Sequence, residues 1–170
     1  MASVIRTRSL AALVVAAGVV LAGCGDEKES TEGLEVTTSQ TPTFVPEKAS
    51  GIQADALDDE VEDPGLHLAY TLQGTVSGQA GGSIITVKVK NLNDVPVPPD
   101  ALDEPTLKAA GGANVDLLDA EDAGVAGMDG LDRPLGAGAT TNLRYPFDIA
   151  PGNLSNARFT IGNVTFIGQL

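Results

Sequence analysis

The sequence is poor in residues that cross-link a chain or build large cores. Its 170 residues include one cysteine, one histidine and no tryptophan, and aromatic residues make up 4%. A single cysteine excludes a disulfide within the chain, so the fold must be held by packing. With few aromatics, valine, leucine, isoleucine and alanine are expected to build most of the core. The 20 glycines and 10 prolines favour turns over long helices.

Basic residues are also scarce, because 10 lysines and arginines face 23 acidic residues and the net charge is −13. Binding to nucleic acid requires clustered basic side chains, whereas here they are scattered among acids, so we expect no nucleic-acid partner. The same charge disfavours electrostatic docking onto anionic lipid. It favours a soluble domain that stays monomeric.

The first 23 residues have the order of an export leader. A short stretch that carries Arg6 and Arg8 is followed by an unbroken apolar run, Leu10 to Leu21, and then by small residues. A transmembrane helix needs about 20 apolar residues, so this run is too short to span a bilayer comfortably. The pattern predicts a signal peptide, residues 1–23, that is removed.

The segment Leu21-Ala22-Gly23-Cys24 resembles the lipobox of bacterial lipoproteins. The resemblance implies that the thiol of Cys24 is acylated, that the chain is cut before it, and that the membrane is a partner through this anchor. The expected location is therefore the extracytoplasmic face of the cell membrane. The two or more acyl chains of a lipoprotein make such an anchor long-lived, because each buried methylene adds about 0.8 kcal/mol. The alternative is an ordinary secretory leader followed by an incidental cysteine.

Residues 24–64 have few strongly apolar residues, many acids and no sustained period of 2 or 3.6. This composition predicts a lipidated, disordered acidic tether. Its Thr-rich stretch, residues 36–43, is of a kind that is O-glycosylated in some exported bacterial proteins, and an unmodified tether is the alternative.

Residues 65–170 change to the alternation of apolar and polar residues that is typical of half-buried strands. Pro96, Pro98 and Pro99 lack amide donors, so their segment is a connection or a sheet edge. Gly111-Gly112 predicts a hairpin turn, and Pro146 places its strand at an edge or a bulge. We predict an all-β fold, an antiparallel β-sandwich without a convincing helix. Its strands are expected at 66–73, 85–90, 106–110, 113–118, 143–149, 157–161 and 164–167.

Four segments of this domain resemble the immunoglobulin-like (telokin-like) domain of actinobacterial lipoproteins. They are Ser83–Asn91, Leu135–Gly138, Tyr145–Ile149 and Phe166–Gly168. The likeness covers roughly residues 66–170 and implies an immunoglobulin-like β-sandwich. It implies no catalytic residue and little about a ligand.

Residues suited to catalysis are few. His67 is the only histidine and is expected on the outward side of the first strand. A catalytic triad or a zinc site would require a nucleophile or further ligands beside it. The glycine pairs lack the Lys-Ser/Thr that follows in a phosphate loop. We therefore expect no enzyme and no cofactor.

Clustered carboxylates on a glycine-rich segment, residues 116–132, could supply oxygen ligands to Ca²⁺. Asp119, Glu121 and Asp122 are the candidate ligands, although their spacing is not that of an EF-hand. The alternative is a mobile acidic loop.

These observations favour a non-enzymatic, membrane-anchored envelope lipoprotein. Its sandwich would present loops or a sheet edge to a protein or cell-wall partner. The alternative is a solute- or Ca²⁺-binding lipoprotein that uses the acidic loop 116–132. A flat apolar surface patch would favour the first function, and a deep pocket lined by converging polar groups the second.

Overall fold

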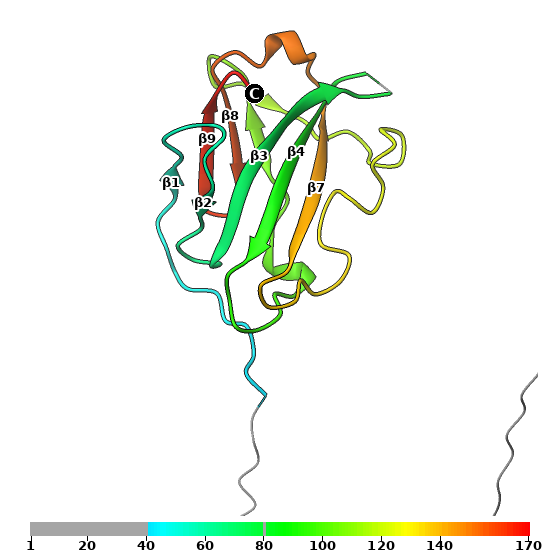
Figure 1. The fold of residues 1–170 in the computed structure, drawn as a ribbon. Coiled ribbons are helices and arrows are strands. Elements are labelled where there is room, and N and C mark those ends of the chain that lie inside the picture. Colours follow the sequence, from blue (N-terminus) through cyan, green and yellow to red (C-terminus); the bar gives the residue numbers. More distant parts are fainter. Residues whose placement is uncertain (1–40, 80) are drawn as a thin grey trace, which may run out of the picture. The chain divides into compact units, whose positions relative to one another are not determined.

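Strands make up nearly all of the regular structure in a computed structural model of the chain (Figure 1). The structure describes residues 41–79 and 81–170. The prediction of an all-β fold is confirmed for these residues, since the two 3-10 helices are single turns. The elements are β1 (Ile52–Gln53), β2 (Val61–Glu62), β3 (Leu68–Ser77), β4 (Ser83–Asn91), η1 (Pro99–Ala101), β5 (Thr106–Lys108), β6 (Asn114–Val115), β7 (Thr140–Phe147), η2 (Pro151–Asn153), β8 (Ala157–Ile161) and β9 (Val164–Gly168).

The strands form two sheets that pack as a sandwich. One has the order β1-β9-β8-β5-β6 and the other β2-β3-β4-β7. In Figure 1, β3, β4 and β7 run side by side in one layer, and β8 and β9 lie in the other. Neighbouring strands are antiparallel, except that β1 runs parallel to β9.

The chain changes sheets twice between β4 and β7. β5 and β6 belong to the five-stranded sheet, and β7 returns to pair with β4, while β5 pairs with β8. These are Greek-key connections, which are common in β-sandwiches.

The core lies between the sheets, where inward residues of both meet. Ile85, Val87 and Val89 of β4 are almost completely buried, whereas the polar residues that alternate with them remain partly exposed, as the sequence pattern predicts. Aromatics are few but concentrated here. The largest fully buried side chains are the five aromatics that the sequence places on strands: Tyr70, Tyr145, Phe147, Phe159 and Phe166. The five aromatics are thus the largest side chains of the core, and aliphatic side chains make up the rest of it.

The predicted turns and edges are also confirmed. β5 and β6 pair across a loop in which Gly111 and Gly112 both have φ of 89°, a conformation that suits glycine. Pro146 lies in β7, the last strand of its sheet. Val97, among the prolines, makes an isolated antiparallel bridge with Leu135.

The disorder prediction for residues 24–64 is wrong for the part that the structure describes. Ile52 of β1 pairs with Val164, and Val61 of β2 pairs with Tyr70. Ala54 and Asp63 are buried. The segment has no period of its own because each strand is two residues long and is held by its partners. The predicted leader 1–23, Cys24 and the rest of the tether up to residue 40 lie outside the described residues.

Candidate functional site

The predicted lipidation site, Cys24, lies outside the described residues, so the candidate sites below belong to the domain that follows it. Within residues 41–79 and 81–170, the structure contains no helix that is both long enough and apolar enough to cross a membrane. Three features of this domain concern function: an apolar pocket, a buried carboxylate and an exposed histidine.

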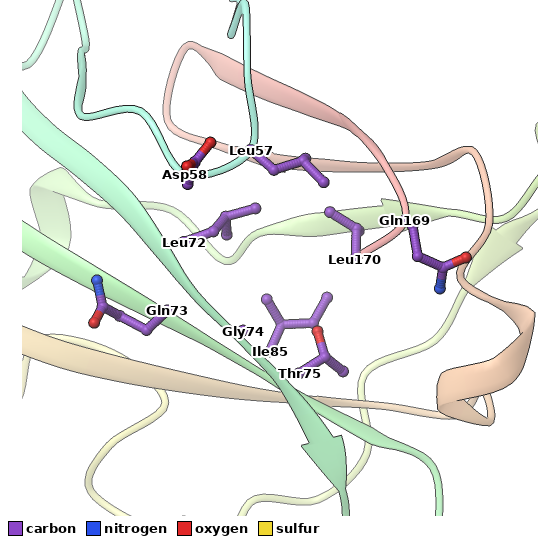
Figure 2. Close-up of a pocket in the computed structure, with 9 residues that line it drawn as sticks. All are labelled: Leu57, Asp58, Leu72, Gln73, Gly74, Thr75, Ile85, Gln169 and Leu170. Carbon is purple, nitrogen blue, oxygen red and sulfur yellow. The ribbon is translucent and has the colours of Figure 1, made fainter.

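An apolar pocket of about 270 Å³ lies where β3 faces the C-terminal end of the chain. The side chains of Leu57, Leu72, Ile85 and Leu170 point toward one common space in Figure 2. The polar side chains of the lining lie around these four. The complete lining is Leu57, Asp58, Leu72, Gln73, Gly74, Thr75, Ile85, Gln169 and Leu170.

A β-bulge in β3 shapes this pocket. The register of β3 against β4 shifts between Leu72 and Gly74, which makes Gln73 an extra residue in the strand. Gly74 has φ of +111°, which L side chains rarely adopt. A bulge bends its strand and re-aims the side chains beside it. Here Leu72 and Thr75, on either side of the bulge, both line the pocket.

The outer edge of β3 is open beside the pocket. β2 pairs with β3 only at Ala69 and Tyr70. Among the residues that the structure describes, no other strand covers that edge, so the rest of β3 is paired on its β4 side alone. An uncovered edge presents unpaired N–H and C=O groups to any strand that can reach it.

A buried carboxylate, Asp63, joins the two sheets. Its Oδ1 accepts hydrogen bonds from the backbone N–H groups of Gly65 (2.8 Å) and Leu66 (3.0 Å) and from Asn163 Nδ2 (2.8 Å). Its Oδ2 accepts hydrogen bonds from Asn163 N (2.7 Å) and the Tyr70 hydroxyl (3.4 Å). Burial alone would raise the pKa of Asp63, but the hydrogen bonds from Asn163, Leu66 and Gly65 lower it. Asp63 is thus ionised and saturated with donors, which suits a structural role.

His67 was predicted to lie in the first strand, but it lies in the turn that precedes β3. Its φ is +47°, and its N–H donates to the carbonyl of Asp63. The ring is exposed between two glutamates, with Nδ1 3.1 Å from Glu62 Oε1 and Nε2 3.7 Å from Glu47 Oε1. The hydrogen bond with Glu62 is the main cause that raises the pKa of His67, burial acts in the opposite direction, and the negative charge of Glu47 adds to the increase.

We expect Glu62→Gln to move the pKa of His67 down toward its ordinary value of 6.5, because the main cause of the increase is removed. Since the folded-state pKa is raised, the pair stabilises the fold below about pH 6.5, and this contribution disappears as the pH rises through the folded-state pKa. An NMR titration of the one imidazole measures the shift directly. Glu104→Gln is the control, and an unchanged titration in Glu62→Gln would contradict the assignment.

The acidic loop is built around its own turn. Asp119 Oδ1 accepts hydrogen bonds from the backbone N–H groups of Glu121 (2.9 Å) and Asp122 (3.0 Å). The loop packs Ala123 and Val125 against Ile84. The structure brings these three carboxylate residues into one turn, but no group of three acidic, histidine or cysteine side chains among the described residues is placed to hold a metal ion.

The acidic segment covers the free side of β7. Arg144 N donates to Met128 O, Leu118 N to Pro146 O and Asp148 N to Asp116 O. The segment is therefore held against β7 by backbone hydrogen bonds and by its two buried residues, Ala123 and Val125.

Sequence reasoning did not find the pocket, because its residues come from four distant parts of the chain. Leu57 and Asp58 fall in the segment that was predicted to be disordered, and Gln169 and Leu170 follow the last strand. One local signal was available, since an isolated glycine within a strand pattern, here Gly74, indicates a bulge. No pattern in the neighbouring sequence indicates that Leu57 packs on Gly168. The contact is close, since a Cβ added at Gly168 would lie 2.8 Å from Leu57 Cδ1.

The apolar pocket adjoins the open edge of β3. Neither this arrangement nor the Asp63 cluster can be assigned through a relative. No protein-family model, curated protein or solved structure matches the chain.

Proposed function

We propose that this chain is an envelope lipoprotein, anchored through Cys24 on the extracytoplasmic face of the cell membrane. There the β-sandwich acts as a non-enzymatic binding module for a protein or cell-wall partner. The anchor is supported by the apolar leader and by Leu21-Ala22-Gly23-Cys24, where the only cysteine of the chain occupies the lipobox position. The net negative charge favours a monomer, because like charges repel, and it disfavours binding to nucleic acid.

One observation carries the binding role: an apolar pocket of about 270 Å³ opens beside an uncovered strand edge. Apolar surface that is left accessible on a small domain marks sites of interaction, because burying it against a partner is favourable. The pocket has one acidic residue, Asp58, and no histidine, cysteine or basic residue in its lining. Such a lining suits recognition through shape and apolar contact.

The titratable groups with perturbed pKa values support the same reading. Burial raises the pKa of both Tyr70 and Tyr145, which keeps both hydroxyls protonated. Asp63 is saturated with hydrogen-bond donors, and His67 pairs with glutamates on the surface. General acid–base catalysis needs such groups within reach of a substrate, whereas here they hold the fold or face solvent.

Metabolic labelling with a palmitate analogue tests the anchor. We expect the wild-type chain to be labelled and to fractionate with membranes, whereas Cys24→Ala is unlabelled and leaves the lipid-anchored fraction. Ser30→Ala, six residues further on, is the control and should behave as the wild type. An unlabelled wild-type chain, or a Cys24→Ala chain that fractionates as before, would contradict the anchor.

Crosslinking in intact envelopes tests the binding role. We expect a discrete crosslinked species with the anchored wild-type chain that is lost when the apolar lining is changed, as in Leu170→Asp. The same crosslinked species with Leu170→Asp would contradict a binding role for the pocket. Leu92→Asp is the matched control, because Leu92 is a partly exposed leucine outside the pocket.

A further inference from the structure

We propose that the sandwich binds an extended peptide segment by β-strand addition to the outer edge of β3, between Leu72 and Ser77, and takes one apolar side chain of that peptide into the pocket. This inference rests on the proposed function and names the class of partner and the surface. In β-strand addition the backbone hydrogen bonds provide affinity, and pockets for alternate side chains provide specificity.

The backbone of β3 offers the required hydrogen-bonding groups. Asp63 N donates to Leu68 O, so the backbone of Leu68 faces the β2 side of the strand. Hydrogen-bonding direction alternates along an antiparallel strand, so Tyr70 and Leu72 face the same side. β2 pairs with Tyr70 and goes no further, which leaves the N–H and C=O of Leu72 without a strand partner. An incoming strand would start its ladder there and continue toward Ser77.

The pocket lies where a side chain of that strand would point. Side chains of an added strand alternate between the two faces of the sheet, and one face of β3 looks toward the space between the sheets. Leu72, Gly74 and Thr75 of the open edge are themselves part of the pocket lining (Figure 2). A peptide that pairs with this edge therefore places one of its inward-facing side chains over the pocket mouth.

The size of the pocket suits one anchoring side chain. Pockets for small-molecule ligands usually measure about 300–1,000 Å³ and enclose most of the ligand. At about 270 Å³ this pocket lies below that range and is partly formed by an open strand edge. Leu57, Ile85 and Leu170 offer apolar contacts on the sides away from the edge. A leucine, isoleucine or phenylalanine of a peptide fits these conditions.

The charge around the pocket predicts a basic peptide. Asp58 lies in the lining and is followed by Asp59 and Glu60, and only Glu60 has a basic partner, Lys88 Nζ at 3.0 Å. No lysine or arginine lines the pocket. Lysine or arginine residues beside the anchoring side chain would thus meet uncompensated negative charge, and their contribution should weaken as salt is added.

Panning a phage-displayed library of random peptides of about twelve residues, longer than most strands, against the purified whole chain tests the proposal. We expect enriched peptides that carry a central apolar residue, flanking basic residues and no central proline. Thr75→Trp, which fills the pocket mouth, should weaken their binding about tenfold or more, as loss of an anchoring contact does. Thr106→Trp on β5 is the control and should leave binding unchanged, because Thr106 is a strand threonine that does not line the pocket and is more exposed than the half-buried Thr75.

Hydrogen exchange then locates the bound peptide. Extra protection within Leu72–Ser77, lost when alternate peptide nitrogens are methylated, supports the proposal. No enriched peptide, protection at another edge, or equal binding to Thr75→Trp overturns it. Binding only after deletion of residues 25–40 overturns it as well, since the chain's own segment would then be the occupant. Uptake of palmitate into the pocket without any peptide binding also overturns it.

The failure of this inference can be told apart from failure of the proposed function. If the crosslinked partner in envelopes is lost with Leu170→Asp but retained with Thr75→Trp, the binding role of the pocket is supported and strand addition is contradicted. An unlabelled Cys24 removes the anchor, whereas the peptide measurement on the purified chain does not depend on it.

Discussion

Replacing Asp63 with asparagine is expected to lower the free energy of unfolding by about 3 kcal/mol, because hydrogen bonds to a buried charge contribute roughly 1.5–3 kcal/mol each and their loss leaves donors unpaired. Asp63 is fully buried and accepts hydrogen bonds from Gly65, Leu66, Asn163 and Tyr70. An asparagine side chain has the same shape, but its amide group would direct N–H donors at the backbone donors around it.

Urea unfolding at pH 7 measures this loss, and Asp55→Asn is the matched control. Asp55 is an exposed aspartate in the same segment, so its replacement should change stability by less than about 0.5 kcal/mol. A loss in Asp63→Asn as small as that of the control would show that the carboxylate does not join the sheets. Gly162→Ala offers a second route to the same cluster, since an added Cβ would collide with Asp63 Oδ2 and lie 2.7 Å from the Tyr70 hydroxyl.

The same carboxylate makes stability depend on pH. The folded-state pKa of Asp63 is lowered from 3.8, so the unfolded chain takes up the proton first. Its contribution is fully present above about pH 4 and is lost as the pH falls through the folded-state pKa. Unfolding measured from pH 7 to pH 2 should therefore show a steeper acid loss in the wild type than in Asp63→Asn. Equal slopes would contradict a lowered pKa.

Phe159→Ala is expected to cost about 3–5 kcal/mol, the range for removing a large aromatic side chain from a core. Phe159 in β8 is fully buried, and its ring contacts two rings of β7 in the other sheet. The ring centroids lie 6.2 Å from Tyr145 and 6.1 Å from Phe147, the latter edge to face. Truncation leaves a cavity at the contact between the sheets. A neighbouring side chain cannot fill it without giving up its own packing contacts.

Thermal unfolding and urea unfolding both measure this effect. Phe44→Ala is the control, because Phe44 packs against the same core but is only partly buried. It should cost less than half as much, since less of its surface leaves water on folding. Equal losses in the two variants would contradict the central place of Phe159.

Most of the strands were predictable because their pattern is local. Residues 85–90 alternate so regularly that burial follows the sequence residue by residue, and Pro146 marked β7 as an edge strand. The start of β3 was misplaced by two residues, because the αL turn at His67 depends on its hydrogen bond to Asp63 and not on hydrophobic alternation. The Gly74 bulge interrupts the same pattern further along.

The order in residues 41–64 was missed for a different reason. β1 pairs with Val164 and Thr165, more than one hundred residues away, and two-residue strands carry no period. An acidic composition correctly indicates that such a segment cannot build a core alone. It does not indicate that the folded sandwich has two strand edges, on β9 and β3, with which the segment pairs, or hydrogen-bond donors that bind the carboxylate of Asp63.

The sequence by itself determined the sheet-forming alternation, the turns, the all-β class and the position of the one cysteine, because each of these depends on neighbouring residues. Only the tertiary structure decided that Asp63 joins the two sheets, that the acidic loop covers β7, and that Leu57, Leu72, Ile85 and Leu170 enclose a pocket. These features come from contacts between distant segments, whose geometry is set when the two sheets close on each other, and no local pattern encodes them.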